Sequence, residues 1–274
     1  MTLPAMAGNR RFIQNAPYML PKDLGEINRL DFQHYVLRAT LKGNFLAPLQ
    51  NPTSILDVGC GSGQWCYEMC AQFPSAQVTG LDLEAGKAEN PPHYCFVAGN
   101  ILDGLLFPDA SFDYVHQRLL MTALPLTAWT AEVKALARGT RPGGWIELVE
   151  GGSEIVPIGP STQRLFELMS QLAAICGLGT SGVIARSLGD YLYQAGIQRM
   201  EKGVIDIPLG QWGDRIGGLM STNFRTTFTS VRDVFQARFH LPAEEFDHLV
   251  VAMQQEWEQR HTVYRVRYAC GQKS

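Results

Sequence analysis

The sequence predicts an α/β fold: a mainly parallel sheet of seven strands with an antiparallel last strand and helices on both faces. Short apolar runs, which favour strands, alternate with amphipathic helical segments through the middle of the 274-residue chain. A glycine-rich turn directly follows the first of these strands and leads into a helix. Strands separated by crossover helices form parallel sheets with right-handed connections, and this order of segments therefore predicts the fold class.

Residues 1–50 are predicted to form an irregular arm and a first helix. Three prolines interrupt residues 1–21. Asp23 and Glu26 have the spacing of a capping box, which marks the start of a helix. Apolar residues then keep helical spacing as far as Gly43. The pattern therefore predicts a helix that begins after Asp23 and ends at the glycine.

Residues 51–151 hold the alternating part of the pattern. The predicted strands are residues 54–58, 77–81, 94–98, 112–116 and 145–149. The predicted helices are residues 64–73 and 128–137. Because ligands of such sheets bind outside the carboxyl ends of the parallel strands, we expect a binding site at that edge.

The C-terminal part, residues 152–274, is predicted to complete the same domain, so that residues 1–274 form a single unit. Apolar residues keep helical spacing over residues 165–176 and 246–257. Strand-like segments cover residues 198–207 and 263–269. Two late strands joined by long helices are typical of an antiparallel finish to the sheet.

The composition excludes several classes of protein. The chain is 46% hydrophobic and 18% charged, which is ordinary for a globular protein. No apolar run approaches the ~18 residues of a membrane-spanning helix, and the N-terminal charges follow the short apolar run, unlike those of a secretory signal. A net charge of −3 and a pI of about 6.1 give no general attraction to nucleic acid or anionic membranes. We therefore expect a cytoplasmic protein with neither as a partner.

The six cysteines predict neither a disulfide framework nor a metal site. Cys66 and Cys70 are spaced to share one face of a helix. No Cys-x-x-Cys pair or nearby histidine cluster completes a metal site around them. Free, buried cysteines and no bound metal are the expectation.

The glycine-rich turn, residues 59–63, admits three interpretations. A phosphate-binding loop would need a lysine, and the turn has none. The dinucleotide fingerprint would need its third glycine where Gln64 stands, and this disfavours a nicotinamide oxidoreductase. What remains is a Gly-x-Gly-x-Gly turn, whose backbone lies close to a ligand at the start of a helix.

The turn and its surroundings resemble the motifs of class I S-adenosylmethionine-dependent methyltransferases. The first motif is Leu56-Asp57-Val58-Gly59-Cys60-Gly61-Ser62-Gly63. The later motifs follow in the family's order, at residues 78–82, 99–101, 107–115 and 141–144. The closest subgroup is the ubiquinone/menaquinone-type small-molecule methyltransferases. Within it, segments 18–21, 29–31 and 116–120 resemble methyltransferase-like regulators of fungal secondary metabolism and related bacterial enzymes. The resemblance implies a Rossmann-like fold with an N-terminal helical lid.

The resemblance also implies S-adenosylmethionine as the cofactor and S-adenosylhomocysteine as the product. The residues expected to bind the cofactor are Asp57, Gly59, Cys60, Gly61, Gly63, Asp82, Leu83, Asn100, Ile101 and Gln117. Asp82 is expected to accept hydrogen bonds from two ribose hydroxyls, and Asn100 to accept one from the adenine amine. Asp57 is expected to bind N–H groups of the loop and, through water, the cofactor's ammonium. Gln117 is expected at the methionine end.

Three residues are candidates for catalysis, although methyl transfer from a sulfonium needs little acid–base help. Glu150 would orient an acceptor amine or hydroxyl, or else pair with Arg118. His116 would act as a base, but strand alternation turns it away from the site if Gln117 faces it, so a packed structural histidine is the alternative. Tyr18 would reach the acceptor from the arm.

The arm itself, residues 1–21, carries too much apolar surface for an idle tail. We expect it to close over the cofactor as a lid with the first helix. The alternative is that it packs on a distant face or on a neighbouring subunit, and the sequence leaves a homodimer open.

The expected function is methyl transfer to a small organic acceptor, such as a specialised metabolite, by in-line displacement at the sulfonium. The alternative is a regulatory protein that keeps the cofactor site without efficient catalysis. The sequence leaves open whether carbon, nitrogen or oxygen receives the methyl group.

Overall fold

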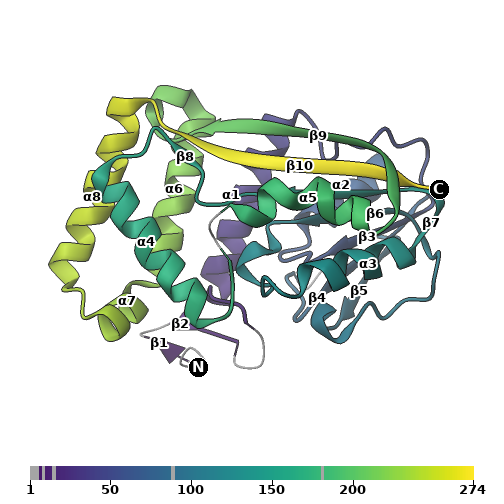
Figure 1. Ribbon diagram of the computed structural model, residues 1–274, viewed down its shortest axis with the longest axis horizontal. Helices are drawn as coiled ribbons and strands as arrows, with labels where there is room; N and C mark the ends of the chain where they lie inside the picture. Colours follow the sequence, from purple (N-terminus) through teal and green to yellow (C-terminus); the bar gives the residue numbers. More distant parts are fainter. Residues whose placement is uncertain (1–5, 8–9, 14–16, 88–89, 180–181) are drawn as a thin grey trace.

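The computed structural model describes residues 6–7, 10–13, 17–87, 90–179 and 182–274 (Figure 1). Its main sheet contains eight strands. They are β3 (Ser54–Val58), β4 (Gln77–Asp82), β5 (Tyr94–Ala98), β6 (Phe112–Arg118), β7 (Thr140–Glu150), β8 (Ile155–Val156), β9 (Ile197–Pro208) and β10 (Val263–Lys273). A separate small hairpin joins β1 (Met6–Ala7) to β2 (Arg10–Arg11).

The order and directions of the strands confirm the predicted fold class. Neighbouring strands follow the order β5-β4-β3-β6-β7-β10. The first five are parallel, whereas β10 runs antiparallel to β7 on one edge and to β9 on the other. The sheet has one strand more than predicted, because the two-residue β8 continues the edge of β7 along β10. The predicted turn at residues 141–144 lies within β7, where the pairing with β6 shifts register.

Helices cover both faces of this sheet. The α-helices are α1 (Leu24–Leu41), α2 (Gln64–Gln72), α3 (Trp129–Gly139), α4 (Pro160–Ile175), α5 (Val183–Gln194), α6 (Asp214–Ser230), α7 (Arg232–Phe239) and α8 (Ala243–Arg260). Short 3₁₀ turns are η1 (Ile101–Asp103), η2 (Leu120–Thr122) and η3 (Gln211–Gly213). The core under α3 and α5 is built around residues such as Trp129 and Leu188, and the core under α2 around Trp65 and Met69. No helix in the described part of the chain is both long and apolar enough to cross a membrane.

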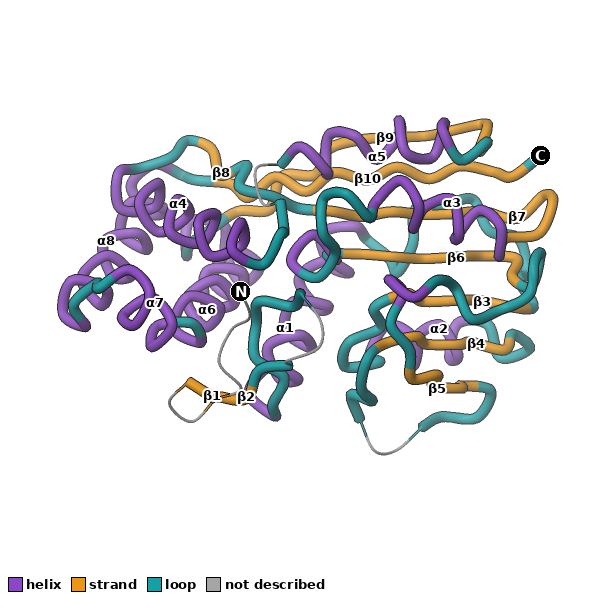
Figure 2. The backbone as a smooth tube through the Cα atoms, turned by 60° about the horizontal axis from the view of Figure 1, so that its bottom comes forward, coloured by secondary structure: helices purple, strands orange, loops and turns teal. Residues whose placement is uncertain are grey.

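A cap of four helices, α4, α6, α7 and α8, lies beyond one end of the sheet (Figures 1 and 2). Because β10 is antiparallel to β7 and its C-terminus lies at the far end, the cap faces the carboxyl ends of the parallel strands. A third core joins the cap to α1 and to the arm residues Phe12, Met19 and Leu20. The cap, α1 and the arm therefore enclose the edge where the sequence predicts a ligand.

Buried polar groups lie between α3 and β6. Gln117 is fully buried, and neither its amide oxygen nor its amide nitrogen has a hydrogen-bond partner in the described part of the chain. The same holds for both carboxyl oxygens of Glu132. Burial raises the pKa of Glu132 to about 8, opposed by the nearby Gln117. This acid is therefore buried in its protonated form at neutral pH.

Replacing Glu132 with glutamine should stabilise the protein increasingly as the pH rises. In the folded protein the pKa of Glu132 is about 8, above its ordinary value of 4.5. The unfolded chain therefore loses this proton at a lower pH, and the stability of the wild type falls as the pH rises from 4.5 to about 8. Glutamine does not titrate. Urea unfolding at pH 5 and pH 8 should show a larger advantage of Glu132→Gln at the higher pH. The exposed Glu244→Gln is the control, and an equal difference at both pH values would contradict the burial argument.

Candidate cofactor site

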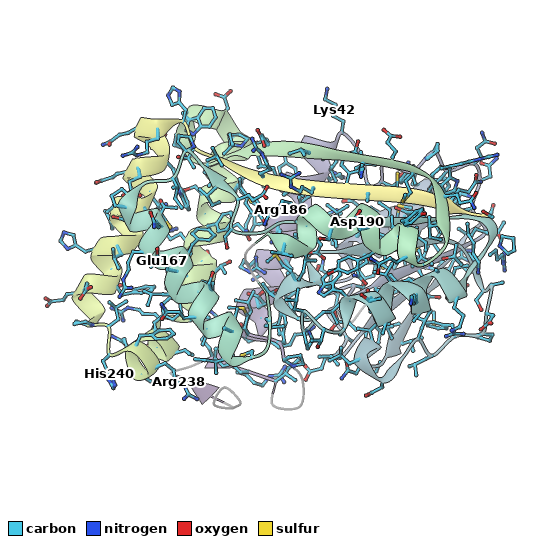
Figure 3. All side chains as sticks on the ribbon, viewed as in Figure 1. Lys42, Glu167, Arg186, Asp190, Arg238 and His240 are labelled. Carbon is cyan, nitrogen blue, oxygen red and sulfur yellow. The ribbon has the colours of Figure 1, made fainter. Side chains whose placement is uncertain are left out.

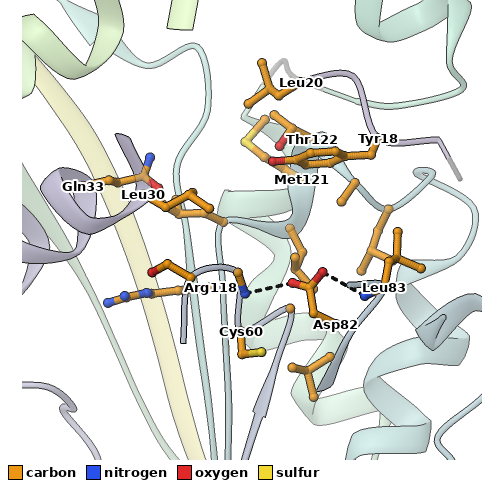
Figure 4. Close-up of a pocket in the computed structure, with 18 of the residues that line it drawn as sticks. Tyr18, Leu20, Leu30, Gln33, Cys60, Asp82, Leu83, Arg118, Met121 and Thr122 are labelled. Atoms are coloured by element: carbon orange, nitrogen blue, oxygen red, sulfur yellow. Dashed lines mark hydrogen bonds between the residues drawn. The ribbon is translucent and has the colours of Figure 1, made fainter. Parts of the chain in front are cut away.

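A cavity lies at the carboxyl ends of β3, β4 and β6, between the sheet, α1 and the cap. Its wall includes nine of the residues that the sequence singles out: Tyr18, Asp57, Gly59, Cys60, Gly61, Asp82, Leu83, Asn100 and Ile101. Figure 4 shows part of this wall, with Asp82 and Leu83 on one side and Tyr18 of the arm across from them. The cavity therefore brings the arm, the glycine turn and the end of β4 together.

The glycine turn approaches its neighbours too closely for larger side chains. Gly59 has a φ of +71°, in the left-handed region that favours glycine. A Cβ atom there would lie 2.4 Å from Leu120 Cδ2. The amide nitrogens of Gly59 and Cys60 both donate to the carbonyl oxygen of Leu81, at 2.8 and 3.1 Å. These bonds hold the turn against β4 at the cavity wall.

Asp82 is the most constrained carboxylate in the cavity. Its Oδ2 atom accepts a hydrogen bond from the amide of Gly61 at 2.8 Å, and its Oδ1 atom accepts one from the amide of Leu83 at 2.8 Å (Figure 4). Lys22 Nζ, which the sequence analysis did not single out, donates to Oδ1 at 2.9 Å. The carboxylate is thereby fixed in orientation at the cavity wall.

The described part of the arm is tied to the same edge by charge. The guanidinium of Arg11 makes two hydrogen bonds to the carboxylate of Glu84, at 3.0 and 2.7 Å. The amide of Lys22 donates to the carbonyl oxygen of Arg11 at 2.8 Å. Tyr18 and Leu20 line the cavity, as a lid would require. The lid remains a prediction, since residues 1–5, 8–9 and 14–16 lie outside the described part of the chain.

The residues present fit S-adenosylmethionine. The carboxylate at the end of β4 suits a ribose, although Gly61, Leu83 and Lys22 already use three of its about four acceptor sites, so that two hydroxyls would compete with Lys22. The turn with left-handed glycines leaves backbone exposed to a ligand. Ile101 and Leu83 line the cavity with apolar surface that would suit a base. Asn100 also lines the cavity, but its amide oxygen already accepts a hydrogen bond from the amide of Leu102 at 3.1 Å. Only the second lone pair of this oxygen is left for the predicted bond to adenine.

Asp57 has other partners than those expected. Its Oδ1 atom lies 2.7 Å from His116 Nδ1, and its Oδ2 atom accepts from Cys66 Sγ at 3.4 Å. The imidazole of His116 stacks on Trp65, with ring centroids 4.0 Å apart. His116 is 1% exposed and does not line the cavity, so the geometry is that of a packed histidine. The expected bonds from Asp57 to the loop amides are absent among the described contacts.

Three more predicted residues lie outside the cavity wall: Gly63, Gln117 and Glu150. Gln117 faces α3 rather than the methionine end, because alternation along β6 turns it to that face of the sheet. Glu150 is fully buried and accepts hydrogen bonds from the amides of Leu120 and Met121, at 2.8 and 3.3 Å. Burial raises the pKa of Glu150 to about 8. It holds η2, which lines the cavity, and is not paired with Arg118.

The far side of the cavity is built by α1 and α6. Arg29 donates from Nε and one terminal nitrogen to the two carboxylate oxygens of Glu26, at 2.9 and 2.6 Å. Its other terminal nitrogen donates to Asn223 Oδ1 at 2.7 Å. Burial and the charge of Glu26 raise the pKa of Tyr18, which lies against this cluster. Segment 29–31 resembled the fungal regulators in the sequence, but Asn223 carried no recognisable pattern.

Comparisons with known proteins bear on the family and the fold of this chain. Residues 30–198 match the family described as a methyltransferase domain. The chain is 30% identical over 241 residues to the N-methyltransferase sirN of Leptosphaeria maculans, covering 83% of this chain and 82% of that protein. It is 29% identical over 260 residues to the N-methyltransferase tcpN of Claviceps purpurea, covering 85% and 89%.

The secondary metabolism regulator laeA of Aspergillus fumigatus is 32% identical over 137 residues, which cover 48% of this chain and 36% of the regulator. Among solved structures, phosphoethanolamine N-methyltransferase 2 of Haemonchus contortus in complex with S-adenosyl-L-methionine matches with a TM-score of 0.54 and 16% identity. That match covers 89% of this chain and 57% of the other. It confirms the predicted fold.

Replacing Asp82 with alanine should weaken the binding of S-adenosylhomocysteine by about 1–3 kcal/mol, the scale of hydrogen bonds to a charged group. Calorimetric titration measures the change, and circular dichroism checks that the variant is folded. Asp109→Ala removes an exposed carboxylate outside the cavity wall and is the matched control. An unchanged affinity of the Asp82 variant would remove the ribose assignment.

Proposed function

The chain belongs to the methyltransferase-domain family, and we propose that it methylates a nitrogen atom of a small, uncharged and largely apolar specialised metabolite. The chain is an S-adenosylmethionine-dependent methyltransferase. Nitrogen is favoured because sirN and tcpN, which align over more than four-fifths of this chain, are both named N-methyltransferases. The acceptor class is argued from the cavity itself.

The proposal rests on the side of the cavity that α1 and α6 build, which we take as the acceptor side. Its charges are paired. There α1 and α6 contribute Leu30, Met220 and Phe224, which are apolar. Among the described residues that α1 and α6 contribute to the cavity wall, Arg29 is the one cation, and Glu26 neutralises it at 2.6 Å. A charged acceptor would therefore lose its hydration without gaining a free counter-ion. An uncharged molecule with apolar surface fits this wall.

The chemistry asks little of the protein beyond alignment and exclusion of water. The bound cofactor supplies an electrophilic methyl group on a positively charged sulfur. An uncharged amine attacks through its own lone pair, so no side chain has to remove a proton first. Tyr18 and Leu20 of the arm line the cavity, which supports a role of the arm in excluding water. Glu150 is a positioning residue: its carboxylate accepts hydrogen bonds from the amides of Leu120 and Met121 and so holds the turn η2, which lines the cavity.

The regulatory alternative is less well supported. The alignment with laeA covers about half of this chain and about a third of the regulator, whereas the two N-methyltransferases align over most of their lengths. The comparisons therefore favour an enzyme over a cofactor-binding regulator.

Transfer of a labelled methyl group to matched acceptors tests the proposal. The panel contains apolar heterocyclic amines, the corresponding alcohols and carbon acids, and charged analogues of each. Label is expected on the uncharged amines, located by mass spectrometry. Label on oxygen or carbon would contradict the nitrogen assignment, and a preference for charged acceptors would contradict the argument from the cavity wall. Asp82→Ala is the control for cofactor-dependent transfer.

Deleting residues 1–21 should speed the release of S-adenosylhomocysteine and lower turnover, because the cavity loses its cover. In the full-length chain, Tyr18→Ala should lower turnover. Tyr18→Phe, which keeps the ring and removes the hydroxyl, shows which of the two groups is responsible. Stopped-flow measurement of product release and the labelled-methyl assay provide the readouts. Tyr193→Ala, which removes an exposed tyrosine from α5, is the control. A truncated protein that folds and works at the full rate would contradict the lid.

A further inference from the structure

Arg118 differs from the other cations on the cavity wall. Lys22 pairs with Asp82 at 2.9 Å, and Arg29 pairs with Glu26 at 2.6 Å. Arg118, the last residue of β6, also lines the cavity. It takes part in none of the ion pairs found among the described residues. Its charge is therefore the one on this wall that lacks a carboxylate partner in the described part of the chain.

The hydrogen-bond partner of Arg118 does not cancel this charge. A terminal nitrogen of its guanidinium lies 2.7 Å from Nδ1 of His34. Because a guanidinium can only donate, Nδ1 must be the acceptor and the imidazole must be neutral. Burial, reinforced by the charge of Arg118, lowers the pKa of His34 to about 4, which agrees with a neutral ring. His34 thus orients the guanidinium without neutralising it.

The nearest carboxylates are already engaged. Among the carboxylates, Asp57 most opposes the loss of the proton from Arg118, followed by Glu68 and Glu147. Asp57 binds His116 Nδ1 at 2.7 Å, and Glu68 binds Arg38 at 3.0 Å. Burial nevertheless lowers the pKa of Arg118. A partly buried cation without a paired anion is unfavourable, so this position suits an anion that arrives with the ligand.

The position of Arg118 in the cavity indicates which anionic group of the ligand would pair with it. In Figure 4, Arg118 and Asp82 lie on opposite sides of the cavity, with Cys60 of the glycine turn between them. If Asp82 binds the ribose, the far side of the turn receives the amino-acid end of the cofactor. Its single anionic group is the α-carboxylate. We propose that Arg118 binds this carboxylate through its guanidinium. The inference rests on the cofactor assignment and is independent of the acceptor.

The geometry of the side chain suits this role. His34 uses one of the five N–H donors of the guanidinium, so four remain for a ligand. The planar fork of a guanidinium matches a carboxylate with two parallel hydrogen bonds. The sequence analysis placed Gln117 at the methionine end, and the structure places the neighbouring Arg118 on the cavity wall instead.

A matched pair of ligands tests the proposal without knowledge of the acceptor. The ligands are S-adenosylhomocysteine and its decarboxylated analogue, which lacks only the carboxylate. Calorimetry should show that the wild type binds S-adenosylhomocysteine about ten- to a hundredfold more tightly than the analogue. Arg118→Gln should lose this preference, by weakening the binding of S-adenosylhomocysteine while changing the affinity for the analogue less than about threefold. Arg118→Lys, which keeps the charge but not the fork, should retain part of the preference.

The control is Arg141→Gln, which removes an arginine paired with Asp113 outside the cavity wall. It should keep the full preference for S-adenosylhomocysteine. Equal weakening of both ligands by Arg118→Gln would show a merely structural role and overturn the proposal. If the glutamine variant fails to fold by circular dichroism, an unchanged preference in Arg118→Lys would overturn it. A wild type that binds neither ligand would instead refute the cofactor assignment.

Discussion

The arrangement of the site depends on the carboxylate of Asp82. This group accepts hydrogen bonds from the glycine turn, from the amide that follows β4 and from a lysine of the arm. The amides of Gly59 and Cys60, by contrast, donate to the carbonyl oxygen of Leu81 and not to this carboxylate. The short side chain of Asp82 at the end of β4 thus holds the glycine turn, the start of the following loop and the arm together at the edge of the sheet.

The helix α1 extends this relation to the cap. On one side, His34 binds Arg118 at the end of β6. On the other, Arg29 bridges Glu26 and Asn223 of α6, and all three side chains are buried. Each of these contacts is a hydrogen bond to a charged group in a poorly hydrated place, where loss of one partner is costly. The side of the cavity at the end of β6 and the side built by α6 are therefore joined by one helix.

Local patterns predicted much of the fold, because strands such as Ser54–Val58 and the glycine turn are encoded by neighbouring residues. Asp82 was predictable for the same reason, since it directly ends a strand. Residues of α6 were not, because Asn223 lies beside Arg29, 194 residues away in sequence, only once the chain is folded. At the end of β6, the sequence placed Gln117 in the binding site. The structure has Arg118, the last residue of the strand, on the cavity wall, and the sequence pattern did not predict where the strand ends. The hydrogen-bond partners of Glu150 were not predictable for a similar reason, because they are backbone amides of η2 that only the fold brings close to this carboxylate.

The shared carboxylate has a consequence for control of the enzyme. If Asp82 binds the ribose, Lys22 and the ribose hydroxyls draw on the same few lone pairs of its carboxylate, and the position of the arm and the occupancy of the site are then thermodynamically linked. Linkage is reciprocal: whatever holds the arm, be it a neighbouring molecule or a change of salt, shifts cofactor affinity by the same factor by which the cofactor shifts the arm. The paired charges of Arg11 and Glu84 are half exposed, which makes ionic strength an input to this equilibrium.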